Sequence, residues 1–147
     1  MGSMNDNETT WTARASRLWR LAAAVARTSW EARRHAGAVG TPAWRRVVEA
    51  SAERMLDAVG VELRVRGARP LAAGPVLFVA NHVSWIDVQA LGAVTGARFV
   101  AKSEVRGWPV VGTMAAHLGT VFHRRGHRRD AMRVKNLLAK LVGTGER

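Results

Sequence analysis

The chain has 147 residues, 48% of them hydrophobic, and its 23 Lys and Arg against 11 Asp and Glu give a formal net charge of +12. This length is that of one domain with a sizeable core. Because the chain has no cysteine, disulfides, a thiol nucleophile and a thiolate metal site are excluded. The excess of positive charge favours polyanionic partners: anionic lipid, a phosphorylated substrate, an acidic carrier protein or nucleic acid.

The first part of the chain predicts a loose start followed by two helices. Residues 1–10 are polar and begin with Met-Gly-Ser, which resembles a cloning scar, so we expect a tag or a disordered segment. Residues 11–59 predict helices over 12–35 and 42–59, which are separated by a stretch containing Gly and Pro.

The first predicted helix mixes arginines with tryptophans. From Trp11 to Arg46 there are eight arginines and one acid. Arginines recur at three-residue intervals on one side of the helix, and apolar residues gather on another arc, namely Leu18, Leu21, Ala22 and Val25. This is the pattern of a cationic amphipathic helix at a lipid surface. We therefore expect residues 11–59 to associate with an anionic membrane; the alternative is a helix packed on its own domain with a solvated arginine face.

No apolar run in this part is long enough to cross a bilayer. The longest, residues 21–26, is six residues, whereas a spanning helix needs about 20. Arginines also interrupt any candidate core of a signal peptide. The predicted mode of membrane contact is therefore peripheral.

Residues 60–147 alternate predicted strands with predicted helices. The strands are expected at 61–67, 76–80, 98–101 and 120–122, and the helices at 84–95, 109–118 and 128–142. Such alternation predicts an α/β fold, a helix–sheet sandwich with a mixed central sheet, preceded by the N-terminal amphipathic helical pair.

The most informative segment is Asn81-His82-Val83-Ser84-Trp85-Ile86-Asp87, which joins the second predicted strand to a predicted helix. A histidine there can act as a general base, and a carboxylate five residues on can orient its ring. In a structural interpretation, Ser84 and Asp87 instead form a capping box and His82 is an ordinary loop residue. The two interpretations are compatible, because a capped helix is a rigid mount for a catalytic pair.

A second segment, Gly119-Thr120-Val121-Phe122-His123-Arg124-Arg125, begins 37 positions beyond His82. Together the two segments resemble the N-H-x-x-x-x-D and G-x-x-F-aliphatic-x-R motifs of the glycerolipid acyltransferases, the family that includes lysophosphatidic acid acyltransferase. His123 departs from the second motif, which has an aliphatic residue at that position. The alternative for Arg124 and Arg125 is an ordinary basic surface turn.

The resemblance, which extends over about 61–147, implies a catalytic pair and a binding strand. His82 would deprotonate the hydroxyl of an acceptor, and Asp87 would hold the histidine ring. Arg125 would bind the acceptor phosphate, because a guanidinium fork matches phosphate geometry. Lys102 resembles a family lysine near that phosphate, and its alternative is a solvated lysine at a strand end. Gly119 and Phe122 would complete the substrate-binding segment.

The resemblance also implies the reaction and its partners. A fatty acyl group would move from acyl-CoA or acyl carrier protein to a lysophospholipid such as 1-acylglycerol-3-phosphate, at the cytoplasmic face of the membrane. The donor would be a substrate, so we expect no cofactor. We also expect no metal site, because His123 and His127 are surrounded by arginines.

The third and fourth motifs of the family, a strand ending in Pro-Glu-Gly-Thr and a later apolar stretch with proline, do not occur. We therefore expect residues 60–147 to form only the first part of the domain, and activity of this polypeptide alone is not assured. Two other functions stay open: a basic nucleic-acid-binding module, suggested by residues 124–129, and an inactive membrane-binding module. Since no nucleic-acid-reading motif is evident, we do not expect nucleic acid as a partner.

Overall fold

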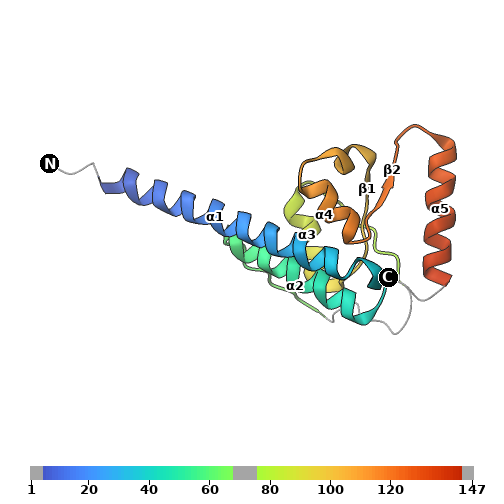
Figure 1. Ribbon diagram of the computed structural model, residues 1–147, viewed down its shortest axis with the longest axis horizontal. Coiled ribbons are helices and arrows are strands. Elements are labelled where there is room, and N and C mark those ends of the chain that lie inside the picture. The colour runs from blue at the N-terminus through green and yellow to red at the C-terminus, as the bar shows by residue number, and fades with distance from the viewer. Residues whose placement is uncertain (1–4, 68–75, 144–147) are drawn as a thin grey trace.

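The computed structural model describes residues 5–67 and 76–143. In chain order its elements are α1 (Asn5–Arg34), η1 (Ala36–Ala38), α2 (Pro42–Val59), α3 (Trp85–Thr95), β1 (Val100–Lys102), η2 (Ser103–Gly107), α4 (Val111–His117), β2 (Val121–His123) and α5 (Arg128–Gly143). Figure 1 shows α1 as a long helix whose N-terminal part reaches well beyond the rest of the molecule. Residues 1–3, which resemble a cloning scar, lie outside the described residues.

All five predicted helices are present, with ends within a few residues of the predicted ones except at the start of α1. That helix begins at Asn5 rather than residue 12, so part of the segment expected to be loose is helical; no Gly or Pro interrupts it. Local signals fix the ends of α2. Thr41 accepts a hydrogen bond from the Trp44 N–H (3.2 Å), Pro42 occupies the first turn, and Gly60 ends the helix at φ +77°.

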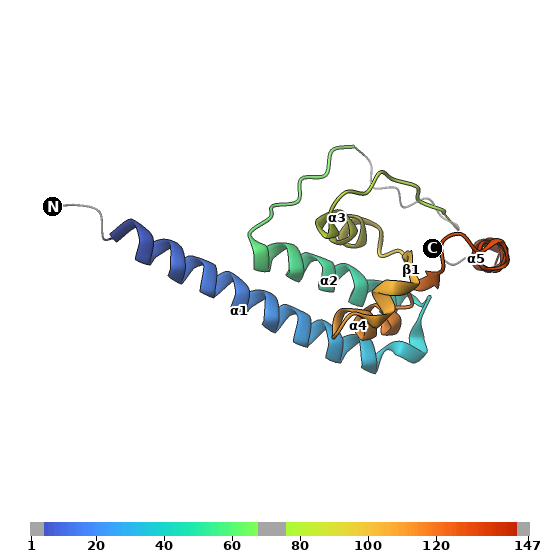
Figure 2. The ribbon, with the colours of Figure 1, turned by 90° about the horizontal axis from the view of Figure 1, so that it is seen from above.

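The predicted N-terminal helical pair is confirmed as α1 packed along α2 (Figures 1 and 2). Ala24, Thr28 and Ala32 recur every four residues along α1 and are all buried. On α2, Trp44 is buried as well. Small residues at this spacing allow close approach of a second helix, so the second half of α1 is part of the body.

α2 also packs on α3, and this contact holds the hydrophobic core. Ala52 and Leu56 of α2 are buried against Ala93 of α3, with Val61 and Ile86 around them. A Cβ atom added at Gly92 would lie 3.2 Å from the Cβ atom of Ala52, so a glycine in α3 permits the close approach. α3 is thereby fixed to the scaffold from its first turn onward.

The predicted mixed central sheet and helix–sheet sandwich are wrong for the described residues, which are mostly helical with one two-stranded parallel sheet. β1 and β2 pair in the register Val100↔Val121, Ala101↔Phe122 and Lys102↔His123, connected through η2 and α4. The predicted strands at 61–67 and 76–80 are irregular chain. A strand exists only where a neighbouring strand takes up its backbone hydrogen bonds, and alternation along one segment cannot supply that neighbour.

Candidate active site

The segment that holds His82 and Asp87 leads directly into α3. Ser84 is the N-cap of this helix, with φ −141° and ψ 152°, and its hydroxyl oxygen accepts a hydrogen bond from the Ile86 N–H (3.2 Å). In return, Asp87 Oδ2 accepts hydrogen bonds from the backbone N–H groups of Ser84 (2.8 Å) and Val83 (2.9 Å). The predicted capping box is therefore present.

The same oxygen of Asp87 also faces the histidine. His82 Nδ1 lies 3.5 Å from Asp87 Oδ2, and the two side chains are 54% and 36% exposed. The backbone hydrogen bond from Val83, then that from Ser84 and the nearby His82 ring, hold the pKa of the Asp87 carboxyl below its usual range. The carboxylate is thus held by two backbone N–H groups, and Nδ1 of His82, rather than Nε2, is turned toward it.

The structural interpretation of this segment is confirmed, and the catalytic one stays a prediction with which it is compatible. The capping interactions hold Asp87, and His82 Nδ1 lies 3.5 Å from the same oxygen. Residues 79–83 are exposed, with Val79 at 89% and Val83 at 95%. His82 is consequently open to a large reactant.

Lys102 and Arg125 lie near each other, at the ends of β1 and β2. Lys102 is the last residue of β1, in register with His123 of β2, and Arg125 follows in the next turn. Both cations act on Glu104. The pKa of Glu104 is lowered first by hydrogen bonds from its own backbone N–H and from Ser103, and further by the charges of Lys102 and Arg125. Two cations at one sheet edge can hold an anionic group.

The His82–Asp87 pair and the two cations, Lys102 and Arg125, are not joined directly within the described chain. No hydrogen bond or ion pair among the described residues joins His82 or Asp87 to Lys102 or Arg125. The arrangement places a histidine–carboxylate pair at the start of α3 and two cations at the ends of β1 and β2. Among the described residues no group of three or more His, Asp or Glu side chains could hold a metal ion.

The remaining predicted binding residues have packing roles. Gly119 has φ +71°, and a Cβ atom there would lie 2.8 Å from Val39 Cγ1; its carbonyl oxygen accepts a hydrogen bond from Arg98 Nε at 3.0 Å. The ring of Phe122 lies 5.8 Å below the guanidinium of Arg106. Both residues thus position β2, and a direct role in substrate binding stays a prediction.

The sequence analysis did not identify Asp130, which holds the turn at Arg124 and Arg125 in place. Its carboxylate accepts a hydrogen bond from the Arg124 backbone N–H and another from Arg133 Nε (2.9 Å). Arg133 in turn donates to the Phe122 carbonyl (2.8 Å). An acidic residue in the first turn of the predicted helix at 128–142 was the available signal. Asp130 therefore helps to fix the backbone on which Arg125 is carried.

Comparison with known proteins identifies the group to which this arrangement belongs. Residues 62–147 match the family model described as Acyltransferase. The chain is 34% identical, over 97% of its length, to 56% of a 1-acyl-sn-glycerol-3-phosphate acyltransferase of Neisseria meningitidis. It is 40% identical, over 74% of its length, to 41% of a lyso-ornithine lipid O-acyltransferase of Pseudomonas aeruginosa. No solved structure matches it.

Two features of the comparison bear on the interpretation. The chain spans about half the length of these curated relatives, and they are named for two different acceptors. The family model covers more than half of the chain, including both motifs. The chain therefore belongs to the acyltransferase family.

Proposed function

We propose that this chain takes part in acyl transfer from acyl-CoA or acyl carrier protein to the hydroxyl of a lysophospholipid such as 1-acylglycerol-3-phosphate. The observation that carries the proposal is the contact of His82 Nδ1 with an Asp87 oxygen that two backbone N–H groups already hold. A general base is needed because a neutral hydroxyl is a weak nucleophile, and one fixed by a carboxylate keeps the correct tautomer.

In the proposed reaction, His82 Nε2 takes the proton of the acceptor hydroxyl as its oxygen attacks the thioester carbonyl. The tetrahedral intermediate then collapses, the carbon–sulfur bond breaks, and the thiol leaves with the proton that His82 returns. Asp87 stabilises the transient imidazolium without taking the proton. Arg125 together with Lys102 binds the acceptor's anionic group. No residue of the chain becomes acylated in this scheme.

The relatives leave open which acceptor this chain uses. The proteins from Neisseria are named for 1-acyl-sn-glycerol-3-phosphate, and that from Pseudomonas for a lyso-ornithine lipid. The two cations around Glu104 favour an acceptor with an anionic headgroup. We therefore propose the phosphate-bearing lysophospholipid as the first acceptor to test and the lyso-ornithine lipid as the second.

We further propose that the protein is peripheral at the cytoplasmic face of an anionic membrane, with α1 on the lipid surface. Along the outer part of α1, Trp11, Leu18 and Trp19 are 62%, 69% and 78% exposed. The described helices include none that is both long and apolar enough to cross a membrane. Exposed tryptophans beside arginines are typical of helices that lie at a lipid interface.

The test is an acyl-transfer assay with radiolabelled acyl-CoA and each of the two acceptors. We expect His82→Ala to lower kcat by about 10²–10⁴-fold, the usual contribution of general base catalysis. His35→Ala, which alters a histidine in the loop after α1, should leave the rate within about twofold on the same basis. Equal rates for His82→Ala and the unaltered chain would refute the assignment of the base, and an inactive unaltered chain would refute activity in this polypeptide.

A further inference from the structure

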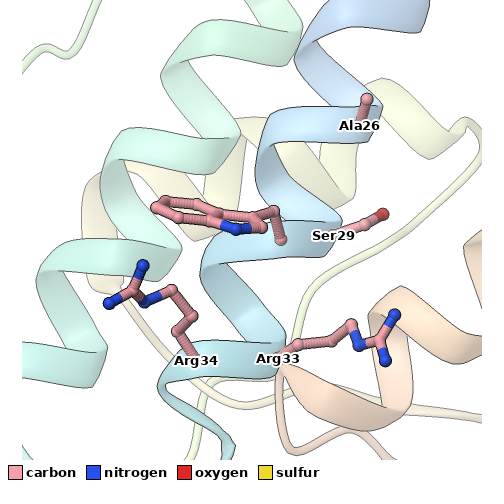
Figure 3. A pocket seen from close by; sticks show the side chains of 5 residues that line it. Ala26, Ser29, Arg33 and Arg34 are labelled. Carbon is pink, nitrogen blue, oxygen red and sulfur yellow. The ribbon is translucent and has the colours of Figure 1, made fainter.

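The last turns of α1 frame a pocket that the acyl-transfer scheme does not use. It has a volume of about 400 Å³ and is lined by Ala26, Ser29, Trp30, Arg33 and Arg34. Figure 3 shows Arg33 and Arg34 reaching out from opposite sides of α1, with Ser29 on the same side as Arg33. The pocket thus combines the apolar surface of Ala26 and Trp30 with one cation on each side of the helix.

The arginines of this pocket have N–H donors that can still bind a ligand. Arg34 lies 4.6 Å from the centroid of the Trp30 ring, and such stacking fixes the plane of the guanidinium while its N–H edge stays available. Neither Arg33 nor Arg34 pairs with an acid of the described chain. The two guanidinium groups can therefore bind an oxygen-rich anion.

An apolar hollow continues the pocket toward the N-terminus of α1. It has a volume of about 470 Å³ and is lined by Leu18, Leu21, Ala22, Val25, Ala26 and Val110. Ala26 lines both hollows, so they are neighbours along α1, and the two together are here called the α1 groove. From Leu18 to Arg34 it extends about 24 Å at the rise of an α-helix.

The wall of the groove opposite α1 is a strained turn. Val110 has φ +61° and ψ −56°, and the Val111 N–H donates to the Pro109 carbonyl at 2.6 Å. This is the classic γ-turn, which is rare and strained, above all for a β-branched residue. Packing in the hydrophobic core does not account for this strained conformation, because Val110 is 56% exposed. It holds an apolar side chain against the side of α1.

We propose that the α1 groove is a second lipid site, which binds one phosphate-bearing amphiphile with its acyl chain in the apolar hollow and its phosphate at the cationic end that carries Arg33 and Arg34. A groove that is apolar at one end and doubly cationic at the other matches a single-chain anionic lipid rather than a free anion or an uncharged chain. The site is separate from the catalytic motif. Figure 2 shows α1 on one side of α2, and α3 with the chain that leads into it on the other.

The test is a titration of the ¹⁵N-labelled protein with lysophosphatidic acid below its aggregation concentration, followed by amide chemical shifts. We expect shifts in residues 18–34 and 110, and weaker binding by about tenfold or more in R33Q/R34Q, since hydrogen bonds to charged groups are strong. The matched control R46Q/R66Q removes two exposed arginines from other segments and should change the affinity of these residues less than about twofold.

A second variant separates loss of the groove from loss of the fold. Val110→Gly removes the apolar wall but relieves the positive φ, so thermal stability should hold or rise. Binding should nevertheless fall by about fivefold, in keeping with one lost apolar contact. Glycerol 3-phosphate and lysophosphatidylcholine, which lack the chain and the net negative charge respectively, should each bind more weakly by about tenfold.

The outcomes discriminate between this site and the proposed acyl transfer, because no acyl donor is present in the titration. Shifts confined to residues 81–87 and 122–125 would overturn the α1 groove while supporting an acceptor site. Equal loss of affinity in R33Q/R34Q and R46Q/R66Q would reduce the effect to non-specific charge and overturn it too. Shifts along α1 that depend on Arg33 and Arg34 support the groove whether or not the chain transfers acyl groups.

Discussion

Asp87 performs two tasks with a single oxygen atom. Its Oδ2 accepts the backbone N–H groups of Val83 and Ser84 and also lies 3.5 Å from His82 Nδ1. A helix cap normally contributes only to the stability of the helix and of the fold. Here the same carboxylate also lies beside the proposed base, so we expect changes at the cap to alter the position of the histidine ring.

Asp87→Asn should separate the charge of this residue from its hydrogen bonds, because the amide oxygen can still accept from the backbone. The folded pKa of Asp87 is lowered by the Val83 and Ser84 hydrogen bonds. Its charge therefore stabilises the fold fully above the unfolded pKa, about 3.9, and this stabilisation is lost as the pH falls through the lowered folded value. We expect the difference in unfolding free energy between the two proteins to shrink from pH 6 to below about pH 4. Urea unfolding across this range measures it, and a difference that is independent of pH would contradict the expectation.

Arg125 should act on binding rather than on the chemical step. If it holds the acceptor phosphate, Arg125→Gln should raise KM for that acceptor by about tenfold to a hundredfold, the usual worth of a hydrogen bond to a charged group, and leave kcat nearly unchanged. Arg124→Gln is the matched control, since the Arg124 backbone N–H donates to Asp130 and this bond survives the change. Steady-state kinetics with varied acceptor measures both. Equal KM in the two variants would remove Arg125 from the binding site.

At the scale of helices, a partly buried ion network joins α1 to α2. Glu31 of α1 accepts a hydrogen bond from Arg27 Nε (3.0 Å) and another from Arg54 of α2. Burial raises the pKa of Glu31, but the hydrogen bond from Arg27 and the charge of Arg54 outweigh it, so the pKa is lowered overall. The network is thus a specific link across the helical pair, beside the small buried residues.

Removal of this link should destabilise the pair. Glu31→Ala leaves Arg54, only 24% exposed, without its carboxylate, and we expect the free energy of unfolding to fall by about 1–3 kcal/mol. Glu53→Ala is the matched control, because Glu53 is an exposed acid of α2 without such a partner; its effect should stay within about 0.5 kcal/mol. Urea unfolding of both variants tests this, and similar losses in the two would show that the network adds nothing specific.

At the scale of the whole molecule, α1 divides into an anchored and a free half. Residues 11–20 are exposed throughout, whereas Ala24, Thr28 and Ala32 are buried further along. In Figure 1 the free half extends away from the rest of the structure. Stability and proposed membrane contact should therefore depend on different parts of one helix.

Deletion of residues 1–17 should separate these properties. Because residues 11–17 are exposed, the melting temperature should change by less than about 2 °C. Binding to anionic vesicles should weaken by up to about thirtyfold, since Arg14 and Arg17 are lost and each contributes about 1 kcal/mol near such a surface, an effect that the loss of Asp6 and Glu8 partly offsets. Vesicle co-sedimentation and thermal unfolding measure the two effects. Unchanged vesicle binding would show that the free half of α1 does not carry the contact.

Sequence by itself determined the helices, the capping box and the order of the two motifs. Helix hydrogen bonds and caps join residues within about four positions of one another. The capping box of Ser84 and Asp87 can therefore be recognised from the local pattern, as can Thr41 at the start of α2 and Gly60 at its end. The motif spacing likewise indicated the acyltransferase family, which the comparisons bear out.

Only the tertiary structure decided the sheet and the surfaces. Residues 61–67 and 76–80 have the pattern of strands, but a strand depends on a partner elsewhere in the chain, and only β1 and β2 find one another among the described residues. The α1 groove also joins distant residues, Leu18 and Val110, through a turn at positive φ that no local pattern indicated. Contacts between residues far apart in the chain depend on packing, and that is the physical reason why the sequence alone left them open.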